Sequence, residues 1–416
     1  MTSDIVVIGA GLAGTRLAVR ARQLGADVTV LGEEPHAPYN RVLLAEVLAG
    51  RYGPEVIALP GTPVRRGIRA VRVDRTARTV HCADGGAIGY GTLVLATGSN
   101  PVLPPLLGPD AGELPDGVRP FRTMDDCLAL AAAVRPGARA VVIGGGLLGV
   151  SAARALAERG AEVLLAQQGE RLMERQLDAA AGALVRAHLE ELGVEVHTEC
   201  RVRRLRGPRG TTAELADGHV LDADLVVLAC GVRPRTGLAR SAGLLVRDGI
   251  VVDDELRTSD PDIRAIGDCA EHAGRVYGLA GPALEQADVL ARSLTSPGPR
   301  YPGTRALTRL TLPGPLAAAH DAPPRQSRTG TVAGSRPLDL AVFGQPDPLP
   351  GDDVVQLADA TRRAYRKVVV REDRLVGGVL IGDLAAVGAL ARTWESDEPL
   401  PSATPLLHLL TADGGF

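Results

Sequence analysis

A glycine pattern near the start of the chain constrains its fold more than any other feature of the sequence. The apolar run at residues 5–8 can form one buried strand, Gly9, Gly11 and Gly14 follow with the spacing G-x-G-x-x-G, and residues 15–24 can form a helix. In a dinucleotide-binding unit the first glycine allows the tight turn, the second lets a pyrophosphate approach the backbone, and the third lets the helix pack closely on the strand. One such pattern is weak evidence, because a tight turn without a ligand also explains it.

The whole pattern occurs a second time. The apolar run at residues 140–143 leads into Gly144, Gly146 and Gly149 and then into a helix-forming stretch. Each copy also has two later apolar runs, at residues 28–31 and 92–98 in the first copy and at residues 161–166 and 224–231 in the second. Two unrelated turns would not share all these landmarks, so we predict an α/β protein with one dinucleotide-binding domain per copy.

The residues that end the second strand differ between the two copies. An acid about twenty residues after the glycines binds a ribose hydroxyl in such domains, and Glu33 is our first choice for this role and Glu34 the second. An ordinary solvated acidic turn is the alternative. In the second copy Gln167 stands where an acid would select NAD, so the 2′-phosphate of NADP is not repelled and Arg171 or Arg175 could pair with it. No arginine lies directly at the strand end, so we place NADH slightly ahead of NADPH and leave both open.

Length, charge and cysteine content exclude several classes of protein. A chain of 416 residues should form about two or three domains. The net charge of −3 argues against general binding to nucleic acid or anionic membranes. The five cysteines form no C-x-x-C pair, which argues against a zinc site or a four-thiolate iron–sulfur cluster within this chain. With no signal peptide and no uncharged apolar run of transmembrane length, we expect a cytoplasmic protein.

The second half of the chain returns to the first domain and then forms a third. A short strand at residues 263–266 ends in Gly267-Asp268, and a helix is expected at residues 283–294. Residues 366–371 and 375–381 flank an acidic turn and predict a hairpin. We therefore predict one dinucleotide-binding domain at residues 1–118 with 244–300, a second at 119–243, and a C-terminal α+β interface domain at 338–416, with a flexible insertion at 313–337.

These motifs together resemble the FAD- and NAD(P)-dependent pyridine nucleotide reductases of the glutathione-reductase-like fold. The landmarks are the two glycine patterns, Ala96-Thr97-Gly98 and Ile266-Gly267-Asp268. The segments at residues 32–44, 172–178 and 365–383 look more narrowly like the flavin module of the assimilatory NAD(P)H nitrite reductase large subunit. The resemblance implies two Rossmann-like domains with FAD and NADH or NADPH as cofactors, plus a small α+β C-terminal domain.

The resemblance also assigns roles to individual residues. It places FAD against Gly9, Gly11, Ala13, Gly14, Glu33, Glu34, Arg41, Ala70, Ala96, Thr97, Gly98, Arg122, Gly267 and Asp268, with Glu285 and Gln286 near the isoalloxazine or on a structural helix face. It places the nicotinamide cofactor against Gly144, Gly146, Leu148, Gly149, Gln167 and Gly231. Two departures from relatives stand out: Ser151 replaces a glutamate that approaches the nicotinamide, and no lysine lies near Glu46. No residue is a certain catalytic group, because flavin N5 is the reactive centre; Ser151, Glu285 and Gln286 are the nearby candidates.

The resemblance implies an FAD-dependent NAD(P)H oxidoreductase that passes electrons to a partner protein. We expect this partner to be an iron–sulfur or siroheme component of nitrite or nitrate assimilation, with this chain as the stand-alone electron-transfer component. The alternatives are a ferredoxin or rubredoxin reductase-like enzyme that serves a monooxygenase, and a non-catalytic FAD-binding module that responds to redox state. The missing cysteine between Asn40 and Glu46 disfavours a thiol mechanism. A homodimer through the C-terminal domain is a further expectation.

Overall fold

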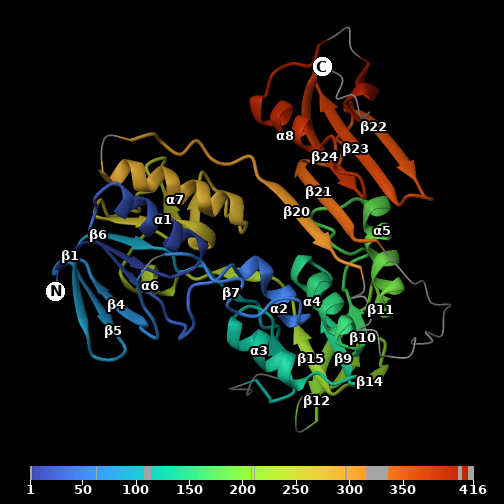
Figure 1. Ribbon diagram of the computed structural model, residues 1–416, viewed down its shortest axis with the longest axis horizontal. Coiled ribbons are helices and arrows are strands. Elements are labelled where there is room, and N and C mark those ends of the chain that lie inside the picture. The colour runs from blue at the N-terminus through green and yellow to red at the C-terminus, as the bar shows by residue number, and fades with distance from the viewer. Residues whose placement is uncertain are drawn as a thin grey trace.

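The chain forms three bodies, each built around its own β-sheet (Figure 1). The computed structural model describes residues 2–61, 63–106, 114–207, 209, 211–295, 298–314, 336–401 and 405–410. Most of the predicted insertion, residues 315–335, lies outside the described residues. The two α/β bodies and the smaller third one confirm the predicted fold class.

The first sheet contains the first glycine pattern. Its strand order is β3-β2-β1-β6-β5-β4, with β18 added beside β6. The strands are β1 (Thr2–Ile8), β2 (Val28–Leu31), β3 (Val64–Arg65), β4 (Ala70–Asp74), β5 (Thr79–Cys82), β6 (Ala87–Leu95) and β18 (Ile263–Ala265). Strands β1, β2, β3, β6 and β18 are parallel, as a doubly wound sheet requires. Helices α1 (Leu12–Gln23) and α7 (Ala280–Thr295) lie side by side in Figure 1, and an ion pair of 2.7 Å joins Arg16 to Asp288 between them.

The second sheet contains the second glycine pattern and is parallel throughout. Its order is β11-β10-β9-β15-β8. The strands are β8 (Val118–Pro120), β9 (Arg139–Ile143), β10 (Glu162–Ala166), β11 (Val194–His197) and β15 (Leu225–Leu228), and the helices are α3 (Met124–Ala133), α4 (Leu147–Glu158) and α5 (Ala179–Glu191). Because Val118 already pairs with Val226 of β15, the domain boundary expected after residue 118 falls inside a strand and lies earlier.

Smaller elements complete and connect these two bodies. Strands β12 (Val202–Arg206), β13 (Thr212–Leu215) and β14 (Val220–Asp222) form a separate antiparallel sheet. Strands β7 (Ser99–Pro101) and β16 (Val232–Pro234) pair where the chain leaves and re-enters the first body. The remaining short elements are η1 (Arg41–Leu43), α2 (Leu44–Leu48), α6 (Gly237–Ser241), β17 (Ile250–Val252), η2 (Gly267–Cys269) and β19 (Ala270–His272).

The third body begins earlier in the chain than the sequence predicted. Its antiparallel sheet has the order β20-β21-β24-β23-β22, formed by β20 (Leu307–Leu312), β21 (Leu338–Gly344), β22 (Asp353–Asp359), β23 (Ala364–Arg371) and β24 (Arg374–Ile381), with α8 (Val387–Ser396) and η3 (Leu406–Leu410). The predicted start of the third domain at residue 338 was wrong. Strand β20, at the edge of this sheet, precedes the insertion in the sequence and pairs with β21, which follows it. The predicted hairpin is confirmed, with Glu372 and Asp373 at φ +49° and +57° in the turn.

A buried ion pair attaches the third body to the second. Lys367, the chain's one lysine, is 6% exposed and donates to the carboxylate of Asp178 at 2.9 Å. Tyr365 donates to the same carboxylate oxygen at 2.6 Å. Apolar residues of β20, β21, β23 and β24 join the core cluster that contains Val185 and Leu189 of α5. The third sheet is therefore anchored on α5 by both packing and charge.

Candidate functional site

Both glycine loops connect a strand to a helix with the same backbone geometry. Gly9, between β1 and α1, has φ +118°, and Gly144, between β9 and α4, has φ +109°. A Cβ atom would lie 2.1 Å from the carbonyl oxygen of Ala96 at the first position and 2.4 Å from that of Ala229 at the second. Only glycine therefore fits these two turns without moving the neighbouring strand.

The second and third glycines of each loop have opposite surroundings. A Cβ atom on Gly11 or Gly146 would meet no described atom within 4 Å, whereas one on Gly14 or Gly149 would lie 2.0 or 1.7 Å from the carbonyl oxygen of the first glycine in its loop. Among the described residues, no side chain caps α1 or α4, and neither first turn contains an acid. An uncapped helix start with open space over the second glycine fits a pyrophosphate in both loops.

Both loops open into one cavity of about 1780 Å³. Most residues that the resemblance assigned to the cofactors line it, and these are Gly9, Gly11, Ala13, Glu33, Glu34, Arg41, Ala70, Ala96, Thr97, Gly98, Arg122, Gly144, Gly146, Leu148, Gln167, Gly231, Gly267 and Asp268. Gly14 and Gly149 are not among the described lining residues, because they lie behind the loops in contact with the first glycine. Their contribution is the close packing of helix on strand.

The two acids after β2 have different partners. Glu34 accepts a hydrogen bond from Arg41 at 2.8 Å, and its other oxygen accepts one from Tyr39 at 2.7 Å, so both oxygens are engaged inside the protein. Glu33 is 39% exposed and pairs with Arg235 and, at 3.4 Å, with Arg69. The hydrogen bond from Arg235 holds the pKa of Glu33 below its ordinary value, so the carboxylate is charged at neutral pH. Glu33 remains the better candidate for the ribose.

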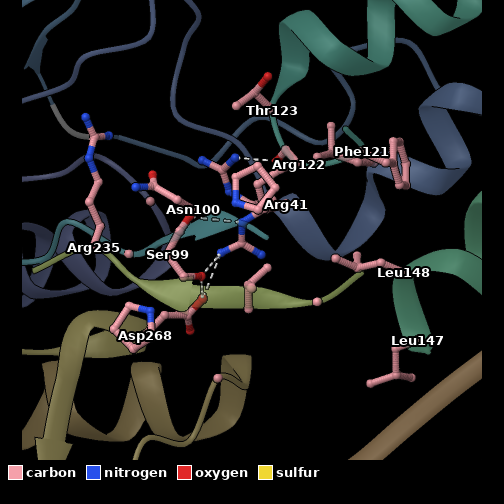
Figure 2. Close-up of a pocket in the computed structure, with 18 of the residues that line it drawn as sticks. Arg41, Ser99, Asn100, Phe121, Arg122, Thr123, Leu147, Leu148, Arg235 and Asp268 are labelled. Carbon is pink, nitrogen blue, oxygen red and sulfur yellow. Dashed lines mark hydrogen bonds and ion pairs between the residues drawn. The ribbon is translucent and has the colours of Figure 1, made fainter. Parts of the chain in front are cut away.

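A second cluster joins three distant segments at one wall of the cavity. Arg122 donates to Asp268 at 2.8 Å and to the hydroxyl of Ser99 at 2.6 Å, and Ser99 donates to Asp268 at 3.0 Å (Figure 2). Arg41 donates to the carbonyl oxygen of Arg122 at 2.5 Å. Burial lowers the pKa of Arg122, and the adjacent Asp268 carboxylate opposes this effect. The structure thus brings Arg41, Arg122 and Asp268 together, and it adds Ser99, which no sequence motif singled out.

Glu285 and Gln286, predicted to lie near the flavin ring or on a structural helix face, are not among the described lining residues of the cavity. Gln286 is 1% exposed, and its amide oxygen accepts from the backbone N–H of Gly267 at 2.8 Å. Glu285 is exposed and accepts from the hydroxyl of Thr304 at 2.6 Å. Only the start of α7, up to Ala283, reaches the cavity. Gln286 therefore supports the η2 turn and Glu285 faces residues 301–304, contacts that favour the structural helix face for this pair.

The second glycine loop is supported by the residue that replaces the expected acid. The amide oxygen of Gln167 accepts from the backbone N–H of Gly145 at 2.8 Å. Ser151 lies one turn into α4 and lines the cavity, so the position where the resemblance implied a glutamate presents a hydroxyl group to the site. At the end of β10 the described lining residues include Gln167 in place of a carboxylate. The charged residues nearby in the lining are Glu174 and several arginines.

The two arginines predicted as partners of a 2′-phosphate, Arg171 and Arg175, have different surroundings. Arg171 donates to a backbone carbonyl at 2.9 Å and is not among the described lining residues, whereas Arg175 lines the cavity. Arg201 and Arg203 also line it and were missed. The N–H of Cys200 donates to the carbonyl oxygen of Gln167, so Arg201 follows directly beside the end of β10. The run Arg201-Val202-Arg203-Arg204 was the signal available in the sequence.

Two further walls of the cavity also come from unexpected places. Residues 307–310 of β20 line it, so the third body contributes to the site. Arg235 also lines it, from the segment after β16, and forms an ion pair with Glu33.

Among the described residues, no helix is long and apolar enough to span a membrane, and no three His, Cys, Asp or Glu side chains are grouped to hold a metal ion.

Comparison with known proteins identifies the architecture. The family model of the pyridine nucleotide-disulphide oxidoreductases matches residues 3–287. The chain belongs to this family. The model of the rubredoxin NAD+ reductase C-terminal domain matches residues 337–397, which covers most of the third body except β20.

The chain is similar along most of its length to several individual proteins. The nitrite reductase [NAD(P)H] large subunit of Klebsiella oxytoca is 34% identical over 427 residues, covering 99% of this chain and 42% of the relative. The assimilatory nitrate reductase electron transfer subunit of Bacillus subtilis is 32% identical, covering 91% of this chain and 47% of the relative. A ferredoxin reductase of a CYP199A2 system from Rhodopseudomonas palustris is 27% identical, with a TM-score of 0.79 and 96% of both chains covered.

These comparisons confirm the class of enzyme and its cofactors. The chain is an NAD(P)H oxidoreductase that uses FAD, and the two glycine loops fit these two dinucleotides. It spans less than half the length of the nitrite and nitrate reductase relatives, at 42% and 47%. Its electron acceptor and the roles of single residues are therefore proposals.

Proposed function

We propose that this chain takes a hydride from NAD(P)H held on the second body and passes the electrons, through FAD held on the first, to a partner redox protein. The observation that carries this proposal is the pair of matched glycine loops that open into one cavity. Two dinucleotides held by such loops meet at their reactive ends, as transfer between a nicotinamide and a flavin requires.

In this proposal the residues of this chain bind and orient the two cofactors. The glycine loops hold the two pyrophosphates, Glu33 holds the adenosine ribose of FAD, and Asp268 accepts from the ribityl chain while Arg122 balances its charge. When bound, FAD supplies hydride acceptance and the release of electrons one at a time. Hydride transfer depends on alignment more than on proton transfer, so a site with Ser151 in place of a carboxylate can still carry out the reaction.

We propose an iron–sulfur or siroheme component of nitrite or nitrate assimilation as the electron acceptor. The support is the similarity to the nitrite reductase of Klebsiella oxytoca and to the nitrate reductase electron transfer subunit of Bacillus subtilis. A cytoplasmic location and a homodimer through the third body complete this proposal.

An anaerobic titration tests the proposal. Protein purified with its flavin should lose the oxidised-flavin absorbance when NADH or NADPH is added. The reduced protein should then be reoxidised fastest by a siroheme-containing nitrite reductase component in rapid-mixing experiments with several acceptors. Absence of bleaching with both nicotinamides would refute the oxidoreductase, and slow bleaching would favour a redox-responsive binding module.

A ferredoxin or rubredoxin reductase is the second candidate. It is supported by the match of residues 337–397 to the rubredoxin NAD+ reductase C-terminal domain and by the ferredoxin reductase from Rhodopseudomonas palustris. Faster reoxidation by a ferredoxin or rubredoxin than by the nitrite reductase component would select this function.

A further inference from the structure

Four charged side chains form a cluster between helices α2 and α4, which we name the Arg154 cluster: Glu46, Arg51, Arg154 and Glu158. Arg154 and Glu158 are 1% and 2% exposed, and Glu46 and Arg51 are 17% and 21% exposed. Arg154 donates to Glu46 at 2.5 Å and to Glu158 at 2.8 Å. Arg51 donates to both oxygens of Glu158 at 2.9 and 3.0 Å. Two positive and two negative groups thus balance in a place that excludes most water.

The cluster joins two helices that border the cofactor cavity. Helix α4 starts directly after the second glycine loop. Ser151, Arg154 and Glu158 lie four, seven and eleven positions after Leu147, so all four residues share one face of the helix. Leu147 and Ser151, at the start of this face, line the cavity. Helix α2, which lies between β2 and β3 in the sequence and packs in the same core cluster as α4, contributes lining residues 44 and 45, directly before Glu46. Figure 1 shows α2 beside α4, so the cluster joins two neighbouring helices that both contribute residues to the cavity.

The geometry of Arg154 suits this link better than that of another cation would. Two separate nitrogens of its planar guanidinium donate to Glu46 of α2 and to Glu158 of its own helix. The single ammonium group of a lysine cannot reproduce this planar two-pronged geometry. Arg51 also donates to the carbonyl oxygen of Gly314, which follows β20, so the third body is tied to the same point. Buried ion clusters contribute little net stability against apolar replacements, but breaking them leaves a charge without compensation.

We propose that Arg154 is a positioning residue that sets how closely the second glycine loop approaches the flavin side of the cavity. This inference rests on the hydride transfer proposed above. A misplacement of about 1 Å between reacting groups can lower a rate by roughly 100-fold. Loosening the cluster therefore lowers the rate of flavin reduction while the binding surface for NAD(P)H, which lies at the glycine loop, is retained.

The test compares Arg154→Lys, Arg154→Met and Glu46→Gln with wild type. At saturating NAD(P)H in rapid-mixing experiments, the limiting rate of flavin reduction should fall roughly 10- to 100-fold in Arg154→Met and less in Arg154→Lys. The dissociation constant of NAD(P)H should stay unchanged. The long-wavelength absorbance that arises when a nicotinamide stacks on a flavin should weaken. In the apoprotein, Glu46→Gln and Arg154→Met should be non-additive in the free energy of unfolding.

A matched control separates positioning from general stability. Leu205→Ala removes a buried side chain of β12 in the same body and should lower the melting temperature without changing the limiting rate. Unchanged rates and unchanged absorbance in Arg154→Lys and Glu46→Gln, at equal FAD content, would overturn the inference, and so would an equal loss of rate in Leu205→Ala. If the wild-type flavin is not reduced at all, the proposed function fails instead, and the apoprotein cycle still reports whether Glu46 and Arg154 are coupled.

Discussion

Replacing the glycines of the second loop one at a time should separate their two physical roles. In Gly149→Ala the new Cβ would lie 1.7 Å from the carbonyl oxygen of Gly144, and real Cβ contacts essentially never fall below 3.0 Å. Helix α4 must therefore move away from the turn by more than about 1 Å, an overpacking that costs about 1–3 kcal/mol. At about 2–4 °C per kcal/mol for a domain of this size, the melting temperature of the apoprotein should fall measurably.

Gly146→Ala should have the opposite profile. The new methyl group would meet no described atom within 4 Å, and φ at this position is −78°, which alanine adopts freely. Gly146 is the N-cap of α4, where alanine is less favourable than glycine by about 1 kcal/mol at most. The methyl group instead occupies the space over the helix start where we place the pyrophosphate.

Two measurements on each variant decide the matter. Thermal unfolding of the apoprotein should show a larger loss for Gly149→Ala than for Gly146→Ala, whereas titration with NAD(P)H should show weaker binding for Gly146→Ala. The same pair in the first loop, Gly14→Ala and Gly11→Ala, provides the control, because it should alter FAD retention and leave NAD(P)H binding intact. Wild-type affinity for NAD(P)H in Gly146→Ala would refute the assignment of the second loop.

Three further predictions follow from individual contacts. Asp268→Asn leaves Arg122 without its carboxylate and should lower the free energy of unfolding by about 1–3 kcal/mol in urea denaturation, with reduced FAD content after purification; unchanged values in both would contradict the role of this pair. Burial raises the pKa of Asp178, but hydrogen bonds that include those from Tyr365 and Lys367 lower it more, so its folded-state pKa lies below 3.8. Its stabilising effect is then complete above that pH and is lost as the pH falls through the folded-state pKa, so wild type and Asp178→Asn should differ in unfolding free energy at pH 7 and converge in acid. Arg201→Glu should lower kcat/KM for NADPH more than for NADH, because a carboxylate beside the end of β10 repels a 2′-phosphate; an equal change for both coenzymes would place that phosphate elsewhere.

The structure changed the sequence-based view of the site mainly where a role depends on partners from distant segments. Glu33 and Glu34 are adjacent and chemically identical, and only their contacts distinguish them, since Glu34 is engaged by Arg41 and Glu33 faces Arg235. The partner of Glu285 could not be predicted either, because the hydroxyl of Thr304 reaches it from a segment 19 residues further along the chain. Strand β20 was missed because an edge strand of six residues is recognised by its pairing with β21 rather than by its own pattern.

The two dinucleotide-binding loops could be predicted from local sequence patterns. Their requirements are local: a positive φ at the first glycine, open space at the second, and close helix packing at the third, each tied to a fixed spacing along the chain. Which charged groups form ion pairs between distant segments became clear only from the tertiary structure. Glu46, near which relatives carry a lysine that this chain lacks, pairs instead with Arg154, 108 residues away on helix α4. Such a pairing depends on how two helices pack, and no spacing along the chain encodes it.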